Sequence, residues 1–257
     1  MNHHHTDGHP APTGRVAAVV PAAGAGVRLG AGMPKAFVEL SGRTMLERAV
    51  EGLLASGVVD DVVAVVPDDR VAQAESMLAA LAGDDHLVVV TTGGAERTDS
   101  VRNGLAALGA AHPDGAAVYD VLLVHDAARC LTPAAPVRRV VEAVRSGRVA
   151  VVPTIPVIDT VKQVDDEGYV VGTPDRSALR AVQTPQGFTP AILLAAYDSI
   201  GDVATDDAGL VERYGERVST VDGDPAAFKI TTAEDRARAL TDLAGVPPGP
   251  ARPQENQ

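Results

Sequence analysis

The stretch RVAAVVPAAGAGVRLGAGMPKAF, residues 15–37, joins an apolar run of strand length to a glycine-rich segment that carries Arg28 and Lys35. A β-strand that leads into such a loop usually presents backbone N–H groups to an anion, because glycine lets the backbone approach a ligand closely. Two cations on one glycine-rich loop favour a ligand with several negative charges, such as a polyphosphate. A flexible turn with solvated charges is the alternative interpretation of the loop alone.

The loop matches neither of the two common phosphate-binding patterns. A P-loop requires a second glycine where this chain has Leu29, and it requires Ser or Thr where Ala36 follows Lys35. The dinucleotide pattern G-x-G-x-x-G begins at Gly24 and also meets Leu29 in place of its third glycine. The remaining pattern, G-x-G-x-R followed by Pro-Lys, indicates a phosphate loop of another kind.

Beyond this loop, apolar runs of strand length alternate with segments of helical period. Strands are expected at residues 15–20, 61–67, 86–90, 119–126, 149–155 and 217–221, with Lys229 at the end of a further strand. Helices are expected at residues 45–56, 72–83, 133–147, 190–200 and 206–215, from Glu96 onward, and after a cap at Thr231 or Thr232. Strands rich in Val and Leu without alternation are typical of a parallel sheet covered by helices on both faces. The pattern predicts an α/β fold with a mostly parallel, Rossmann-like sheet, whose ligands bind beyond the carboxyl ends of the strands.

The alternation breaks between Thr154 and Gln183. The segment IDTVKQVDDEGYVVGTP, residues 158–174, reads as two short strands joined by an Asp-Asp-Glu-Gly turn, and thus as a β-hairpin inserted into the α/β chain. An isolated hairpin is marginally stable in water, so we expect this arm, at about residues 156–176, to pack on another surface. A second subunit is one candidate for that surface.

Length and composition favour one domain. A chain of 257 residues with 46% hydrophobic residues can bury a large core, and no long linker divides it. We expect a single domain over residues 15–245, between disordered tails at residues 1–14 and 246–257 that are rich in residues that do not build a core. Neither end resembles a signal peptide, and no apolar run reaches the roughly 18 residues of a membrane span, so we expect a soluble, cytoplasmic protein.

Charge and cysteine content exclude several classes of function. The net charge of −12 argues against binding to nucleic acid or to an anionic membrane, which usually requires a basic surface. The single cysteine, Cys130, excludes an intrachain disulfide and a cysteine-rich metal site. Only three of the 22 basic residues are lysines, namely Lys35, Lys162 and Lys229. In a chain that otherwise uses arginine, a lysine suits a position that needs a compact charge.

Further polar motifs follow the expected strands at the same edge of the sheet. Gly93 and Gly94, ahead of a helix that carries Ser100, offer a backbone-lined pocket for a base or ribose, although such a pair can also be a simple turn. Asp126 follows a buried strand, where its carboxylate can bind Mg²⁺, accept a hydrogen bond from a ligand hydroxyl or cap the next turn. Its neighbour His125 is most simply a hydrogen-bonded residue at the strand end.

Seven motifs, taken in order, resemble those of one family. They are PAAGAGVRLGAGMPKAF, GGAERTDSV, VHDAAR, DTVK, TPDRSALRAVQTPQGF, TDDAGLVE and FKITT, within about residues 16–243. They are similar to the successive motifs of the 2-C-methyl-D-erythritol 4-phosphate cytidylyltransferases. The resemblance implies a homodimeric enzyme that joins CTP to a polyol phosphate and releases diphosphate, on the non-mevalonate route to isoprenoids.

The resemblance also assigns roles to the residues that match these motifs. It implies that cytosine and ribose are held by Ala22, Ala23, Gly24, Gly94, Ala95 and Ser100, and that the triphosphate is surrounded by the catalytic cations Arg28, Lys35 and Lys229. It implies that the meeting point of the two substrates is lined by Asp126, Ala127 and Arg129, with Thr205 close by. Thr160 and Arg176 on the arm would reach the polyol phosphate of the neighbouring subunit. Some members carry an acidic residue in place of Ala95, so a side-chain contact to the base would be lost here.

This chemistry needs positioning and charge rather than a general base, because the attacking phosphate oxygen is already ionised at neutral pH. Several cations around two anions suit such a reaction. Mg²⁺ or another divalent cation would be held largely by the triphosphate, with Asp126 as its candidate protein ligand. Two alternatives stay open: a cytidylyltransferase of the same fold that acts on ribitol 5-phosphate, and a nucleotide-binding regulator without catalysis.

Overall fold

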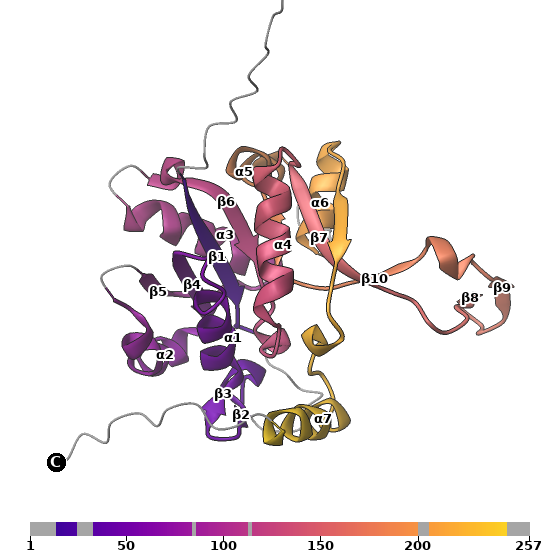
Figure 1. Cartoon of the computed structure of the whole chain (residues 1–257), viewed down its shortest axis with the longest axis horizontal. Coiled ribbons are helices and arrows are strands. Elements are labelled where there is room, and N and C mark those ends of the chain that lie inside the picture. Colours follow the sequence, from indigo (N-terminus) through magenta and orange to yellow (C-terminus); the bar gives the residue numbers. More distant parts are fainter. Residues whose placement is uncertain (1–13, 25–32, 84–85, 113–114, 200–205, 246–257) are drawn as a thin grey trace, which may run out of the picture.

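The computed structural model describes residues 14–24, 33–83, 86–112, 115–199 and 206–245 (Figure 1). The two predicted tails lie outside these residues, apart from Gly14, and so do Arg28 and Thr205. Within the described ranges, no helix is both long enough and apolar enough to cross a membrane.

Eight strands of the described chain form one sheet, in the order β10-β7-β11-β6-β1-β4-β5, with β12 paired to β7. They are β1 (Arg15–Pro21), β4 (Asp61–Val66), β5 (Leu87–Thr92), β6 (Tyr119–Val124), β7 (Ala150–Pro156), β10 (Arg180–Val182), β11 (Gln186–Phe188) and β12 (Ser219–Asp222). Strand β1 pairs in parallel with β4 and β6, β4 with β5, and β12 with β7. Only β10 and β11 run antiparallel to their neighbours, so the prediction of a mostly parallel sheet is confirmed.

Helices cover both faces of this sheet, as predicted. They are α1 (Met45–Leu54), α2 (Val71–Leu78), α3 (Arg97–Ala111), α4 (Ala134–Arg145), α5 (Pro190–Ser199), α6 (Asp207–Tyr214) and α7 (Ala233–Ala244). Successive residues of β1 point to opposite faces and enter two separate cores, one shared with α1, α2 and α4 and the other with α3, α5 and α6. Figure 1 shows α4 lying along the face of the sheet that is nearer the viewer.

Short elements complete the described chain. A small hairpin consists of β2 (Glu39–Leu40) and β3 (Arg43–Thr44), directly before α1. The 3₁₀ helices are η2 (Lys35–Phe37), η3 (Asp68–Arg70), η4 (Ala79–Leu81), η5 (Gly115–Val118), η6 (Ala127–Arg129), η7 (Arg176–Ala178) and η8 (Pro225–Ala227). Of these, η2, η6 and η8 matter most below, because they carry or adjoin predicted site residues.

The predicted hairpin arm is present and projects away from the sheet beyond β10 (Figure 1). Its strands, β8 (Gln163–Val164) and β9 (Val170–Gly172), pair antiparallel. The Asp165 carboxylate accepts a hydrogen bond from the Tyr169 N–H, and Gly168 supplies the positive φ of 88° that the turn requires. Several large apolar side chains of the arm are exposed: Ile158, Val164, Tyr169, Val170 and Val171. The arm therefore presents apolar surface that the described part of its own chain leaves uncovered.

A buried carboxylate ties the strands together at the opposite, amino-terminal edge of the sheet. Asp61 accepts hydrogen bonds from the Arg15 guanidinium at 2.6 Å and from the Tyr119 hydroxyl at 3.0 Å. Burial alone would raise the pKa of the Asp61 carboxyl, but these donors and the Leu87 N–H hold it below its ordinary value. This cluster joins β1, β4 and β6 far from the edge at which ligands are expected.

Candidate active site

A cavity of about 260 Å³ lies at the carboxyl ends of β1, β5 and β6. The predicted site residues among its lining are Ala22, Ala23, Gly24, Lys35, Gly94, Ala95, Ser100, Asp126, Ala127 and Lys229. Strand topology explains why the residues that follow β1, β5 and β6 meet, because the carboxyl ends of parallel strands share one edge. The structure therefore brings most of the described candidate residues into one site.

The Gly93-Gly94 turn forms one wall of the cavity through close packing. A Cβ at Gly93 would lie 2.5 Å from Ala23 Cβ and 2.9 Å from Ser100 Oγ. The buried Ser100 hydroxyl accepts a hydrogen bond from the Gly94 N–H at 3.1 Å and donates one to the Glu96 carbonyl at 3.2 Å. In this structure Ser100 thus shapes the turn, and glycine is required where the wall meets the loop after β1.

Asp126 is the centre of charge in the cavity. Its carboxylate lies 2.8 Å from Lys229 Nζ and 3.8 Å from both Arg97 Nη2 and Arg129 Nε. Burial alone would raise the pKa of the Asp126 carboxyl, but Lys229, Arg97 and Arg129 hold it below its ordinary value. Although Asp126 precedes η6, its side chain makes no capping hydrogen bond, so the cap interpretation is wrong. Its carboxylate instead gathers three cations.

Lys229 does not end a strand, contrary to the prediction. It lies in segment 223–230, which contains η8, precedes α7 and belongs to no strand of the described residues. Two hydrogen bonds attach this segment to η6: Arg129 Nη1 donates to the Ala227 carbonyl at 2.7 Å, and the Ile230 N–H donates to the Ala128 carbonyl at 2.9 Å. Thr232 then caps α7, as one of the two predicted options. Attachment to η6, which follows Asp126 directly, brings the ammonium to that carboxylate.

Arg97 is a cavity residue to which the sequence assigned no role. Its guanidinium donates two hydrogen bonds to the buried Asp207 carboxylate, at 2.6 and 3.1 Å, and Asp207 also accepts one from the Tyr197 hydroxyl at 2.5 Å. Burial would lower the pKa of Arg97, but the Asp207 charge raises it above its ordinary value. Both residues stand in motifs quoted above, GGAERTDSV and TDDAGLVE, and their opposite charges were the only signal in the sequence.

Three further candidates do not line the cavity of their own chain. The Arg129 guanidinium donates to the Val182 carbonyl at 3.1 Å and, as described, to Ala227, so it holds backbone segments around the site. Thr160 and Arg176 are exposed on the arm, where Arg176 Nη1 donates to the Ile158 carbonyl. Neither of these arm residues is therefore part of the described cavity of its own chain.

His125 is a hydrogen-bonded residue at the strand end, as predicted. It is buried, its Nδ1 lies 3.0 Å from Thr184 Oγ1, and burial lowers its pKa to about 4. The Thr184 hydroxyl also accepts a hydrogen bond from the Asp126 N–H at 3.0 Å. His125 thus supports the backbone at Asp126 from behind and does not line the cavity.

The donor set suits a divalent cation that brings most of its own ligands. In the described ranges, no group of three or more His, Cys, Asp or Glu side chains could hold a metal ion. Asp126 still offers a hard carboxylate oxygen beside the cavity. Mg²⁺ commonly takes one or two carboxylates and completes its shell with substrate phosphates and water. The residues present fit such an ion, for which Asp126 would be the protein ligand.

The parallel sheet, the glycine-lined cavity at its carboxyl edge and the cations around Asp126 define a nucleotide-binding enzyme of the α/β class. Residues 16–244 match the sequence model of the family described as 2-C-methyl-D-erythritol 4-phosphate cytidylyltransferase. The chain belongs to this family, and it is a nucleotidyltransferase.

Individual relatives and solved structures agree. The chain is 58% identical over 231 residues to the 2-C-methyl-D-erythritol 4-phosphate cytidylyltransferase of Rhodococcus jostii (strain RHA1), across 89% of this chain and 96% of that protein. The enzyme of the same name from Nocardia farcinica (strain IFM 10152) is 58% identical over 229 residues, across 89% and 94%. The crystal structure of the Thermus thermophilus enzyme of that name has a TM-score of 0.69 and 34% identity, covering 90% of this chain and all of that one. The 4-diphosphocytidyl-2C-methyl-D-erythritol synthase of Anaerococcus prevotii DSM 20548 has a TM-score of 0.76 and 28% identity, covering 91% of this chain and all of that one.

Proposed function

We propose that this protein transfers the cytidylyl group of CTP to 2-C-methyl-D-erythritol 4-phosphate and releases diphosphate. The family match over residues 16–244 carries this proposal, and the cavity supplies a site with suitable charge and shape. The product, 4-diphosphocytidyl-2-C-methyl-D-erythritol, belongs to non-mevalonate isoprenoid synthesis. Because CTP is available inside cells, the proposal places the enzyme in the cytoplasm.

The reaction is an in-line displacement at the α-phosphorus of CTP. A phosphate oxygen of the polyol substrate forms a bond to the α-phosphorus, the bond to the oxygen bridging the α- and β-phosphorus breaks, and diphosphate leaves with the electron pair. The attacking oxygen is already ionised, so no general base is needed. The protein must align two anions and neutralise them, for which Lys35, Lys229 and Arg97 line the cavity and Arg28 is the expected fourth cation.

We infer that the reaction also uses a divalent cation, Mg²⁺ or another, which would be held largely by the triphosphate and would take Asp126 as its protein ligand. When bound, it neutralises triphosphate charge and stabilises the leaving diphosphate. The Asp126 carboxylate is ionised, because Lys229, Arg97 and Arg129 hold its pKa below the ordinary value, and it lies beside the cavity.

The nucleoside of CTP would lie against the wall of the cavity that the loop after β1 and the Gly93-Gly94 turn form. The small residues Ala22, Ala23, Gly24, Gly94 and Ala95 line this wall and leave backbone groups accessible to a base and ribose. Ala95 offers no acidic side chain, so any contact it makes with the base uses the backbone.

Gly93→Ala is expected to raise the KM for CTP and to destabilise the fold by about 1–3 kcal/mol, because the added Cβ would press on Ala23 and Ser100. Urea unfolding and steady-state kinetics measure the two effects. Gly83→Ala is the matched control, since a Cβ there has no atom within 4 Å among its described neighbours. An unchanged KM and unchanged unfolding midpoint in Gly93→Ala would contradict the proposed wall.

We further infer a homodimer in which each arm reaches the neighbouring subunit. The exposed apolar side chains of the arm support this inference, because surface of that kind is usually covered by a partner. An isologous exchange would carry Thr160 and Arg176 to the partner's cavity, which lacks a contribution from its own arm.

A coupled assay for diphosphate release tests the proposed activity. With Mg²⁺ we expect turnover of CTP and 2-C-methyl-D-erythritol 4-phosphate, much weaker turnover of UTP or ATP, and none in excess EDTA. Faster turnover of ribitol 5-phosphate would transfer the assignment to the alternative substrate. Tight CTP binding without turnover of either polyol phosphate would favour a nucleotide-binding regulator. Turnover that persists in excess EDTA would contradict the role given to the divalent cation.

A further inference from the structure

Gln183 is a buried polar residue that no part of the mechanism above uses. It directly follows β10, the strand on which the chain returns from the arm, and it is 2% exposed. Its side-chain amide pairs with the backbone of Asp224: Nε2 donates to the Asp224 carbonyl at 2.8 Å, and Oε1 accepts from the Asp224 N–H at 2.9 Å. The side chain thus satisfies both backbone groups of one residue in the way a neighbouring strand would.

The surrounding contacts leave this pairing little freedom. The Gln183 N–H donates to the Pro153 carbonyl at 2.8 Å, and the Gly223 N–H donates to the Thr154 carbonyl at 2.8 Å. A Cβ at Gly223 would overlap Gln183 Oε1, so glycine permits the close approach. Gln183 and the beginning of segment 223–230 are therefore both fixed to β7.

This segment carries Lys229. Asp224 caps η8 by accepting a hydrogen bond from the Ala226 N–H at 2.8 Å, and η8 leads to Lys229. The two bonds to η6 described above, at Ala227 and Ile230, hold the far part of the same segment. Beyond Gly223, the described residues of this segment belong to no strand, and the Gln183 amide supplies the Asp224 backbone with the two partners that a neighbouring strand would otherwise provide.

We propose that Gln183 is a positioning residue for the reaction. It fixes the beginning of segment 223–230 and, through η8, sets where the Lys229 ammonium lies relative to Asp126. The proposal rests on the proposed function, in which Lys229 stabilises charge on the reacting phosphates. Gln183 does not line the cavity, so it acts through the backbone and does not touch substrate.

Gln183→Leu is expected to lower kcat by about 10–100-fold while the KM for CTP changes by less than about twofold, because small misplacement of a group that acts in the transition state reduces kcat. In the Lys229→Ala background the same substitution should lower kcat by less than about twofold, since the group it positions is already gone. Equal losses in both backgrounds, or a folded Gln183→Leu with parental kcat, would overturn the proposal. If Gln183→Leu does not fold, Gln183→Met is used in its place, because methionine removes the same two hydrogen bonds to Asp224 and has an unbranched side chain like glutamine.

Tyr119→Phe is the matched control, because it also removes a buried hydrogen bond, to Asp61, at the opposite edge of the sheet. It should lower stability and leave kcat unchanged in both backgrounds. A loss of kcat in Tyr119→Phe comparable to that in Gln183→Leu would show that general destabilisation explains the effect, and would overturn the assignment.

Hydrogen exchange at the Ile230 amide provides a readout that does not depend on turnover. This N–H bonds to Ala128 and not to Gln183, so its exchange reports order transmitted along the segment. Gln183→Leu should accelerate exchange at Ile230 by about tenfold or more and leave core amides of β1 unchanged. Unchanged exchange at Ile230 would overturn the positioning role even in an active enzyme, whereas a parent without CTP turnover would refute only the proposed function.

Discussion

Lys229→Ala is expected to lower kcat for diphosphate release by about 10²–10³-fold, equivalent to about 3–4 kcal/mol of lost transition-state stabilisation. The KM for CTP should change far less, because an interaction made mainly in the transition state acts on kcat. Lys35→Ala should behave in the same way, since Lys35 lines the same cavity. Arginine should substitute poorly at either position, because its planar head cannot reproduce the position of a compact ammonium.

The Lys229→Ala variant should fold normally. Asp126 would keep Arg97 and Arg129 at 3.8 Å, so the substitution leaves no buried carboxylate without a cation nearby. Circular dichroism verifies folding, and Arg213→Ala, which removes an exposed charge in the last turn of α6, controls for net charge. A kcat within about threefold of the parent in both lysine variants would contradict their catalytic role.

Deleting the arm, residues 157–175, is expected to yield monomers with almost no activity. The deletion removes the apolar surface proposed to join the subunits together with Thr160, and it displaces Arg176. Light scattering distinguishes the two states, because the chain has a mass of 26.4 kDa and the intact protein should show about twice that value. An intact protein that measures as a monomer and still turns over CTP would contradict the exchanged arm.

Mixing two inactive variants tests whether the arm completes the partner's site. Lys229→Ala removes a catalytic cation from the cavity and Arg176→Ala removes the guanidinium of the arm, and each homodimer should be nearly inactive. After subunit exchange, half of the dimers carry both chains and each of these has one intact site, so activity should return to about a quarter of the parental value. Failure to recover activity, with exchange demonstrated by mass, would mean that each arm serves its own chain.

Local sequence patterns predicted most of the fold, because the apolar pattern within each segment determines whether that segment forms a strand or a helix. The run RVAAVV became β1, and the apolar stripe of residues 45–54 became α1 with all six of its apolar residues buried. The arm followed from its turn chemistry. Strand β11 was not predicted, since three residues carry too little pattern and its place between β6 and β7 depends on distant pairing.

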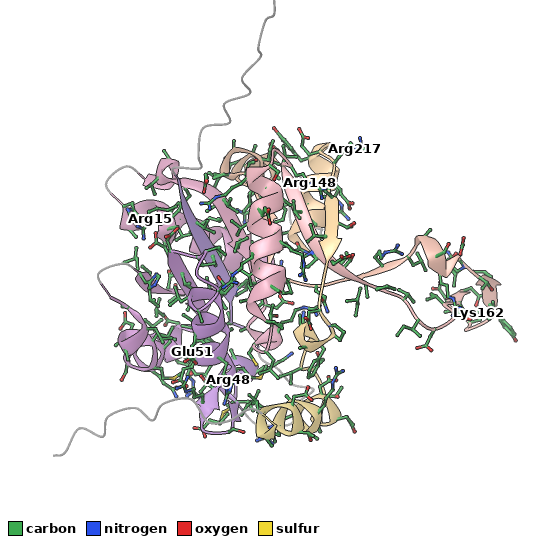
Figure 2. The ribbon with its side chains drawn as sticks, viewed as in Figure 1. Arg15, Arg48, Glu51, Arg148, Lys162 and Arg217 are labelled. Carbon is green, nitrogen blue, oxygen red and sulfur yellow. The ribbon has the colours of Figure 1, made fainter. Side chains whose placement is uncertain are left out.

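Site residues were predicted where they directly follow a recognisable strand or turn. They were missed where their position depends on a side chain far away in the sequence. The glycine turn and Asp126 follow their own strands directly. The Arg97–Asp207 pair spans 110 residues, and nothing in either motif alone reveals the other. Lys229 was found by its motif but misplaced on a strand, because the apolar residues beside it suggest β pairing whereas the segment is held by Arg129 and Gln183. Figure 2 shows the third lysine, Lys162, far out on the arm, so the lysine count alone did not identify a site in its own chain.

The measurement that tests the central claim most directly is ³¹P nuclear magnetic resonance of the protein with CTP, Mg²⁺ and 2-C-methyl-D-erythritol 4-phosphate. We expect the monophosphate resonance of the polyol to disappear as two coupled resonances of a diphosphate diester and one of free diphosphate grow together. The diester must contain the phosphorus of the polyol and the α-phosphorus of CTP, because the substrate phosphate attacks that atom. Persistence of the polyol monophosphate while CTP is unchanged, or is hydrolysed to CMP, would contradict the account.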